Sequence, residues 1–278
     1  MVVPDDHSPC GVPRDVAGHG LTLRAWEWGR AGDPPIVLLH SLAAHGHWWD
    51  WTAPLLAGRF HVVALDFRGH GESQWAEPAS YRFTDHVGDV VAALDALGWR
   101  APVVIGHSLG SYVGAYLAAL HPDRVSRLVI ADMLTFWTEE MAATAERQAS
   151  RPRPTFASRA EVAARFRLVP PETSAPAEWL RHLGEAGAVE RRPGEWEQAF
   201  DRQVFLHSPI DPWPFLPGVI CPTLVVRGEQ SPLMDRDQWL RVTTAVQHGQ
   251  FAEVRAAAHH LILDDPPELV SILERWLG

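Results

Sequence analysis

The sequence predicts an α/β protein built on a mostly parallel, doubly wound sheet, and three observations point to this fold class. Short apolar runs, typical of buried strands, alternate along the chain with segments whose apolar residues have helical spacing. One of these runs leads through a glycine-rich turn directly into an apolar helix. The chain is also long enough, at 278 residues, for one large domain with an insertion.

The composition is that of an ordinary globular protein and argues against nucleic-acid and membrane partners; a small-molecule partner is expected only from the motifs described below. Hydrophobic residues make up 46% of the chain and charged residues 21%, as in ordinary globular domains. The net charge is −10 and every basic residue is arginine, which argues against a nucleic-acid partner. No apolar run approaches the roughly 20 residues of a membrane helix, and the first residues show no secretory pattern, so a cytoplasmic protein without a membrane partner is expected. The two cysteines, Cys10 and Cys221, are far apart and lack metal-binding spacing.

The first half of the chain carries most of the expected core. Strands are predicted over Leu21 to Trp28, Ile36 to Leu39, Phe60 to Leu65, Ala101 to Ile105 and Val125 to Ala131. Helices are predicted over Trp48 to Leu56, Tyr81 to Leu97 and Ser111 to Leu120. Four polar residues follow strands directly: His40, Asp66, Ser108 and Asp132. Since ligands of such sheets bind beyond the carboxyl ends of the strands, these side chains are expected near one site.

The strand–helix alternation stops at Met133 and resumes near residue 218. The segment 133–217 is predicted to be a helical lid over the strand ends, and residues 1–132 and 218–278 form the core. Its expected helices are Glu139 to Gln148, Arg159 to Leu168, Glu178 to Leu183 and Glu195 to Val204. A minority of its many aromatic side chains should line an apolar substrate pocket. The expected pocket residues are His40, Ser41, Trp137, Trp179 and Trp213.

The remainder of the chain returns to the core pattern. A strand is expected over Thr223 to Gly228, a helix over Asp235 to Val246 and a last strand over Phe251 to Val254. Two adjacent histidines, His259 and His260, follow in a loop. Pro266 is placed to open the closing helix.

The glycine-rich turn reads Gly106-His107-Ser108-Leu109-Gly110, which is the pattern G-x-S-x-G between a strand and a helix. Such a turn forces the serine into a sharp bend and exposes its oxygen above the sheet edge. A Cβ at either glycine would collide with neighbouring backbone, and Gly114 lets the helix lie close to the sheet. The free N–H groups at the start of that helix favour an oxyanion.

Together these motifs resemble the α/β-hydrolase family from about Leu21 to Gly278. The resemblance is carried by His40 with its loop, the run from Asp66 to Ser73, the serine turn, and the run from His259 to Pro266. It implies that Ser108 is a nucleophile and that a histidine near the end of the chain removes its proton. His259 fits the family's spacing to the later acidic residue and proline, whereas His260 is one position out of register.

The acid that would orient this histidine departs from the common family pattern. Most relatives have an aspartate three residues after the glycine that here is Gly228, and Ser231 occupies that position. Some relatives carry the acid after the strand that follows the serine helix, where Asp132 stands. Asp132 is therefore the first choice for the acid, and Glu229 remains the alternative.

The resemblance also implies an oxyanion hole made by the backbone N–H groups of Leu109 and Leu42. No cofactor is expected. A metal site formed by His40, His45 and His47 is discounted, because no carboxylate pattern accompanies these residues.

These features predict a serine hydrolase that cleaves a carboxylic ester or lactone of an apolar or aromatic small molecule through an acyl-enzyme on Ser108. Alternatives on the same fold are a C–C bond hydrolase, a cofactor-free haloperoxidase or a lyase. A ligand-binding receptor without turnover is a further alternative, supported by the serine at position 231. The sequence does not predict the oligomeric state.

Overall fold

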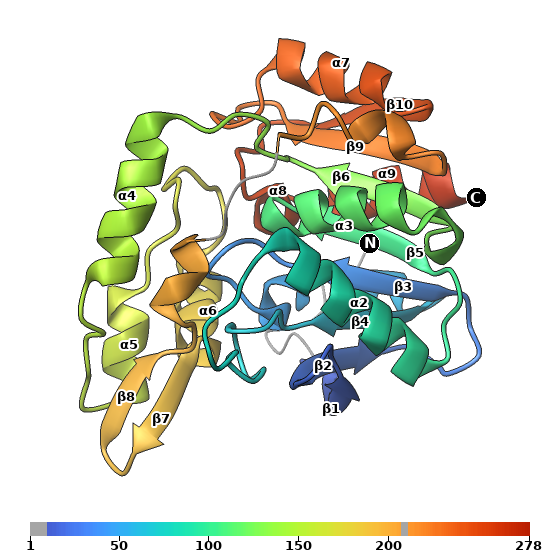
Figure 1. The fold of residues 1–278 in the computed structure, drawn as a ribbon. Helices are drawn as coiled ribbons and strands as arrows, with labels where there is room; N and C mark the ends of the chain where they lie inside the picture. Colours follow the sequence, from blue (N-terminus) through green and yellow to red (C-terminus); the bar gives the residue numbers. More distant parts are fainter. Residues whose placement is uncertain (1–9, 207–210) are drawn as a thin grey trace.

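A computed structural model describes residues 10–206 and 211–278. Its centre is an eight-stranded sheet in the order β1-β2-β4-β3-β5-β6-β9-β10 (Figure 1). The strands are β1 (Val12–Ala17), β2 (Thr22–Trp28), β3 (Pro35–Leu39), β4 (His61–Leu65), β5 (Val103–His107), β6 (Arg127–Ala131), β9 (Pro222–Gly228) and β10 (His248–Val254). From β4 to β10 all neighbours are parallel, and only β1 and β2 run antiparallel to their partners. The predicted fold class is confirmed.

Helices cover both faces of this sheet. One face packs against α2 (Phe83–Leu97), α3 (Leu109–Leu120) and α7 (Arg236–Ala245). The other packs against the short helices η1 (Gly46–Trp49) and α1 (Ala53–Leu56), and against α8 (Leu261–Asp264) and α9 (Pro266–Leu277). Two further 3₁₀ turns, η2 (Pro122–Arg124) and η4 (Leu216–Gly218), connect core elements.

The central strands are buried on both faces, as their apolar runs predict. In β3, Val37 and Leu39 belong to the core beneath α2 and α3, while Ile36 and Leu38 belong to the core on the opposite face. Successive side chains of a strand point to opposite faces, so a strand covered on both sides needs apolar residues at every position.

The segment 133–217 forms a separate set of elements beside the sheet, at the left of Figure 1. It contains α4 (Glu139–Ser150), α5 (Arg159–Arg165), α6 (Ala177–Ala186), β7 (Ala188–Arg192), β8 (Glu195–Gln198) and η3 (Arg202–Leu206). We call it the inserted segment. It meets the loops that follow two core strands: Asp201 N–H donates to Gly69 O at 2.8 Å, and His260 Nε2–H donates to Pro170 O at 2.8 Å.

The helix predicted over Glu195 to Val204 is wrong. Residues 195–198 form β8, which pairs with β7 in an antiparallel hairpin, and η3 begins only at Arg202. The two strands are joined by Pro193 and Gly194, and Gly194 has φ 77°. A Pro-Gly turn closes a hairpin, and this turn chemistry outweighs the helical propensity of the flanking glutamates.

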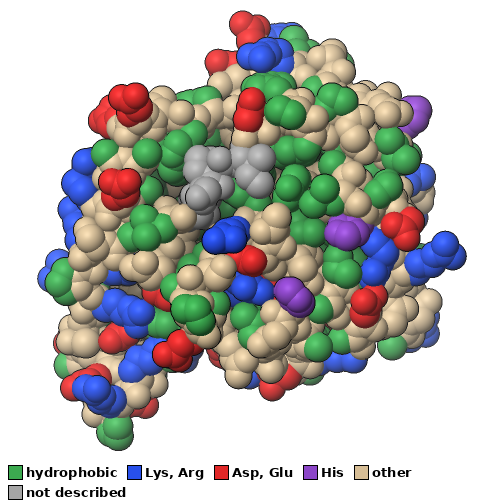
Figure 2. Space-filling view, in the orientation of Figure 1, with side chains coloured by type: hydrophobic (Ala, Val, Ile, Leu, Met, Phe, Trp, Pro, Cys, Tyr) green, Lys and Arg blue, Asp and Glu red, His purple; other side chains and the backbone are tan. Residues whose placement is uncertain are grey.

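The surface of the inserted segment is strongly charged at the hairpin. Figure 2 shows arginine and acidic side chains mixed at the lower left, over β7 and β8, whereas apolar side chains are more frequent over the upper half of this face. Residues 190–195 are all exposed. No helix within residues 10–206 and 211–278 is long and apolar enough to span a bilayer.

Candidate active site

Ser108 stands in a strained turn between β5 and α3. Its backbone lies at φ 53° and ψ −112°, a region that residues other than glycine rarely adopt. The two glycines of the motif make the turn possible. A Cβ on Gly106 would lie 2.2 Å from Gly110 O, and one on Gly110 would lie 2.1 Å from Leu39 O. The steric role predicted for both glycines is confirmed.

Asp132 occupies the corresponding position at the end of the neighbouring strand, β6. Its N–H donates to Val226 O at 2.8 Å, so its backbone is tied to β9 even though its φ is 51°. Aspartate tolerates this left-handed conformation better than most residues. The side chain is fully buried, and its Oδ2 accepts a hydrogen bond from Gly228 N at 3.0 Å.

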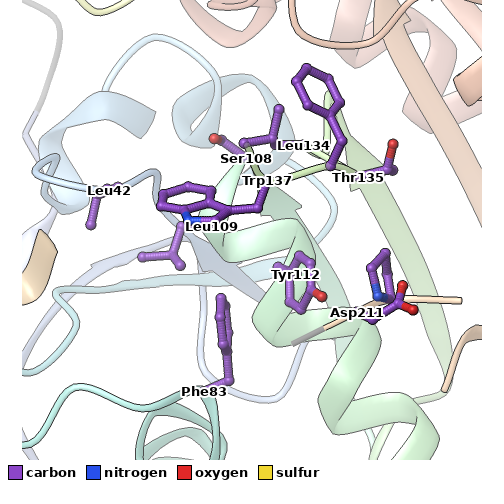
Figure 3. A pocket seen from close by; sticks show the side chains of 11 residues that line it. Leu42, Phe83, Ser108, Leu109, Tyr112, Leu134, Thr135, Trp137 and Asp211 are labelled. Carbon is purple, nitrogen blue, oxygen red and sulfur yellow. The ribbon is translucent and has the colours of Figure 1, made fainter. Parts of the chain in front are cut away.

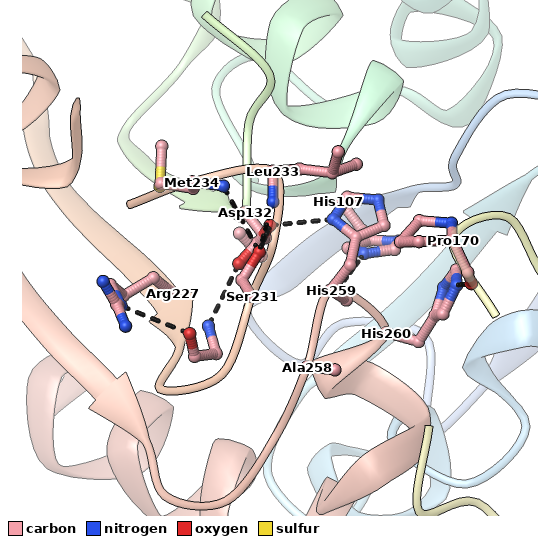
Figure 4. A network of polar contacts seen from close by, with 12 residues as sticks. His107, Asp132, Pro170, Arg227, Ser231, Leu233, Met234, Ala258, His259 and His260 are labelled. Carbon is pink, nitrogen blue, oxygen red and sulfur yellow. Dashed lines mark hydrogen bonds and ion pairs between the residues drawn. The ribbon is translucent and has the colours of Figure 1, made fainter. Parts of the chain in front are cut away.

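His259 meets this carboxylate directly. Its Nδ1 lies 2.7 Å from Asp132 Oδ1, and its side chain is almost completely buried (Figure 4). An ionised carboxylate only accepts, so Nδ1 carries the proton and Nε2 has a free lone pair. Glu229, the alternative acid, is exposed and accepts a hydrogen bond from Ala256 N at 2.8 Å. The geometry therefore favours Asp132 over Glu229.

Ser231, which stands where most relatives are expected to have an aspartate, belongs to the same network. Its hydroxyl donates to Asp132 Oδ1 at 2.6 Å (Figure 4). Its oxygen accepts weaker hydrogen bonds from Leu233 N and Met234 N at 3.2 and 3.3 Å. Asp132 thus accepts three hydrogen bonds, from Gly228, Ser231 and His259, which orient it and favour its charged form.

Two further histidines pack against His259. His107 Nε2–H donates to His259 O at 2.8 Å, and the two rings are 4.8 Å apart. The ring of His260 is 5.1 Å from that of His259. Both neighbours are buried, and burial lowers the pKa of each, so neutral rings surround His259. His260 is a hydrogen-bonded neighbour, as predicted.

Burial shifts the pKa values of the central pair in opposite directions. It lowers the pKa of His259 to about 4 and raises that of Asp132 to about 6. The hydrogen bonds from Ser231 and Gly228 oppose the shift at Asp132. At neutral pH the pair consequently holds an ionised Asp132 beside a neutral His259, the state in which His259 can accept a proton.

A cavity of about 400 Å³ opens onto Ser108 (Figure 3). Its lining is mostly apolar and comes from the loop after β3, from α2 and α3, and from the start and end of the inserted segment. The lining residues are Leu42, Phe83, Ser108, Leu109, Tyr112, Leu134, Thr135, Phe136, Trp137, Asp211 and Pro212. Of the predicted pocket residues, Trp137 is among them.

The other four predicted pocket residues lie elsewhere. His40 is fully buried and uses both ring nitrogens, with Nδ1 donating to Ser41 O at 2.7 Å and Nε2 accepting from Phe67 N at 2.9 Å. It holds two loops together, and Ser41 is buried beside it. Trp179 stacks on Trp51 with 4.3 Å between ring centres.

Trp213, the fourth of these residues, packs beneath Arg241, whose guanidinium lies 4.1 Å from its ring centre. A large aromatic side chain buries well in many places, so its presence in the sequence does not specify which surface it covers.

Tyr112 is a pocket residue that the sequence analysis missed. It lies one turn after Ser108 in α3, and its N–H donates to Ser108 O at 3.2 Å. Its ring is buried in the lining, and its hydroxyl has no hydrogen-bond partner among the described residues. The signal was its position at i+4 from the serine, which places both side chains on one face of the helix.

Two residues expected to supply oxyanion donors line the cavity with Ser108. They are Leu42, in the loop after β3, and Leu109, the first residue of α3. The backbone N–H of neither residue donates a hydrogen bond within the described part of the chain. Both N–H groups are thus unused by the described residues, and the oxyanion hole that the resemblance implies stays a prediction.

The fold and this geometry define an α/β-hydrolase, and comparison with known proteins agrees. Residues 34–266 match the model of the alpha/beta hydrolase fold, so the chain belongs to that family. It is 27% identical over 247 residues to "Putative carbamate hydrolase RutD" of Pantoea ananatis, a match that covers 87% of each chain. It is 34% identical over 120 residues to a "Serine hydrolase-like protein" of Danio rerio, a match that covers 43% of this chain but only 37% of that relative.

A solved structure, of E-2-(acetamidomethylene)succinate hydrolase, superposes with a TM-score of 0.84 at 23% identity, covering 96% of this chain and 99% of that one. At this identity the likeness shows the fold alone.

Proposed function

We propose that the protein is a serine hydrolase that cleaves a carboxylic ester or lactone through an acyl-enzyme on Ser108. The observation that carries the proposal is the hydrogen bond between His259 Nδ1 and Asp132 Oδ1. Ser108 lies in a strained turn that lines the cavity, and the residue before it, His107, packs its ring against that of His259. A serine hydroxyl is a poor nucleophile unless a base takes its proton during the attack. His259, neutral and oriented by Asp132, is suited to be that base.

The proposed reaction has two halves. Ser108 Oγ attacks the substrate carbonyl carbon while His259 Nε2 takes the hydroxyl proton, and the N–H groups of Leu42 and Leu109 stabilise the oxyanion that forms. The ester C–O bond then breaks, and His259 returns the proton to the leaving alcohol oxygen. A water molecule repeats the sequence on the acyl-enzyme, which releases the acid and restores the Ser108 hydroxyl.

The lining of the cavity supports an apolar or aromatic substrate of small to medium size. Leucine, phenylalanine and tryptophan side chains dominate it, and Asp211 is the one charged side chain among the described lining residues. An anionic acyl group would meet this carboxylate without a positive partner, so neutral substrates are favoured.

Active-site labelling and a substrate screen test the proposal. A fluorophosphonate probe should label the wild type at Ser108 and leave Ser108→Ala unlabelled. A panel of p-nitrophenyl esters, lactones and aryl carbamates should give turnover that falls by about 10⁶-fold in Ser108→Ala. Carbamates are included because a relative carries that name. Absence of labelling would overturn the acyl-enzyme, and tight ligand binding without product would favour the receptor alternative.

A further inference from the structure

Four side chains of metal-ligand type meet at a point outside the lining of the cavity. Cys10, His47, Asp50 and His182 each place a donor atom within 4.8 Å of the other three. Asp50 Oδ2 is the common partner: it lies 2.9 Å from His47 Nδ1, 2.8 Å from His182 Nε2 and 3.5 Å from Cys10 Sγ. None of the four lines the cavity at Ser108. The catalytic proposal leaves this cluster unexplained.

The four residues come from three separate parts of the chain. Cys10 lies just before β1, His47 and Asp50 flank the end of η1, and His182 projects from α6 of the inserted segment. The cluster therefore joins the start of the described chain, the core and the inserted segment at one point. The sequence analysis expected no metal site, because it considered His47 only with His40 and His45 and did not bring these distant residues together.

We propose that Cys10, His47, Asp50 and His182 form a tetrahedral site for a divalent transition metal, with Zn²⁺ as the ion that suits them best. One thiolate, two imidazoles and one carboxylate are the ligand types that Zn²⁺ takes in proteins. Four protein ligands fill a tetrahedron, so the site would be a closed, structural one without a position for substrate.

The spacing of the donors suits such an ion after a small adjustment. Metal–ligand bonds of roughly 2.0–2.3 Å place the donors of a tetrahedral zinc site about 3.3–3.7 Å apart. The Cys10–Asp50 distance of 3.5 Å lies within that range. The two His–Asp distances are shorter because protons bridge them, and each must lengthen by roughly half an ångström when a metal replaces those protons.

Packing already orients the ligands. Asp50 is fully buried, and the ring of His47 lies 3.9 Å from that of Trp26. The ring of His182 meets the edge of Trp51 at 5.3 Å. Locked rotamers of this kind reduce the ordering needed on metal binding. Cys10 is exposed and leaves the cluster open to an entering ion.

Cobalt and zinc binding to the purified full chain test the proposal. After treatment with a chelator, the wild type should take up one Co²⁺ per chain, with the visible bands of a tetrahedral cobalt ion and a near-ultraviolet thiolate-to-cobalt band. Zn²⁺ should displace the cobalt stoichiometrically and raise Tm. Cys10→Ser should abolish the thiolate band and weaken Zn²⁺ binding by at least about 100-fold.

Two matched variants separate this site from other metal-binding groups. Cys221→Ala removes the other cysteine, and His259→Ala removes a member of the second histidine cluster, formed with His107 and His260. Both should keep the cobalt spectrum of the wild type. Two results would show that the cluster is held by hydrogen bonds only. One is a wild-type cobalt spectrum without the thiolate band, and the other is a Zn²⁺ affinity that stays unchanged in both Cys10→Ser and His182→Asn. These measurements do not depend on catalytic activity, so they test the metal site independently of the proposed serine hydrolase function.

Discussion

At the scale of single residues, Asp132 has the position that matters most for the chemistry. It reaches His259 from the end of β6, while the position expected for an acid in most relatives, 231, holds a serine that donates to it. Replacing the usual aspartate with serine therefore removes a competing charge and adds a hydrogen-bond donor. The serine at 231 suits an acid at 132, because two carboxylates this close together would raise each other's pKa.

Substituting the acid tests this assignment. Asp132→Asn should lower kcat by about 10⁴-fold, because the amide no longer favours the Nδ1–H tautomer of His259. Glu229→Gln is the matched control, and its kcat should stay within about twofold of the wild type, since that carboxylate is exposed and contacts Ala256 N. Steady-state turnover of the best ester substrate provides the measurement. The opposite ranking would make Glu229 the acid.

The pH profile reports the same pair. Burial lowers the pKa of His259 below its ordinary 6.5 and raises that of Asp132 to about 6. Once the pair takes up one proton, on either residue, His259 can no longer act as an oriented base. Activity is thus present above the pKa at which the His259–Asp132 pair takes up its first proton, and it is lost as the pH falls through that value.

We expect the acid limb of kcat/KM at about pH 6, and an unshifted limb in Glu229→Gln. A limb clearly above 6.5 would mean that attraction between His259 and the carboxylate outweighs burial.

At the scale of elements, the serine turn depends on how closely β5, α3 and the loop after β3 approach one another. Gly110→Ala would put a Cβ 2.1 Å from Leu39 O, a backbone atom that cannot move alone. We expect the free energy of unfolding to fall by about 1–3 kcal/mol and kcat/KM by at least about tenfold. Urea denaturation and ester turnover measure the two effects.

Gly114→Ala in the same helix is the control. Its Cβ would lie 3.1 Å from side-chain carbons of Leu128 and Val104, which can shift, and alanine favours the helix over glycine. Its stability should remain within about 1 kcal/mol of the wild type and its activity should be kept. Equal losses in both variants would contradict the special role of the turn.

Most helices and strands of the core could be predicted from the sequence alone. Every core strand from β2 to β10 was predicted. The central strands are short apolar runs that fit a strand covered on both faces, whereas β2 and β10 are less apolar and partly exposed. Ser108 and Asp132 were predicted as polar side chains that directly follow strands, whose ends meet at one edge, whereas His259 was predicted from the family resemblance.

The residues of β8 were predicted to be helical and β7 was not predicted, although Pro193-Gly194 indicated a turn between them. The pocket was the least predictable part. Trp179 and Trp213 pack against Trp51 and Arg241, contacts between distant segments that no local pattern encodes.

At the scale of the whole molecule, the inserted segment is joined to the core by a buried polar contact. Tyr81 Oη–H donates to Asp201 Oδ2 at 2.7 Å, and Arg153 lies 3.1 Å from Asp201 Oδ1. Tyr81 precedes α2 and the other two residues belong to the inserted segment. Both Tyr81 and Asp201 are buried, and the Tyr81 hydroxyl depends on Asp201 as its acceptor, whereas Asp201 also accepts from Arg153.

A double-mutant cycle measures this contact. Asp201→Ala should lower the free energy of unfolding by about 1–3 kcal/mol, because it leaves the Tyr81 hydroxyl buried without its acceptor. Tyr81→Phe should lower it by roughly 0.5–1.5 kcal/mol. The double variant should be no less stable than Asp201→Ala alone, because it no longer contains the Tyr81 hydroxyl that lacks an acceptor in that single variant. Strictly additive losses would show that the two side chains act independently.

The position of Asp132 in the chain limits how the inserted segment could be replaced by another. The inserted segment, as defined above, begins at Met133, so the proposed acid and the first residue of that segment share a peptide bond. With an acid after β9, as the usual pattern has it, an insertion at this point could be exchanged for another by recombination without touching the catalytic residues. In this chain the start of the inserted segment adjoins the proposed acid. A different segment inserted here must therefore still allow Asp132 its φ of 51°, because that backbone conformation directs the carboxylate to His259.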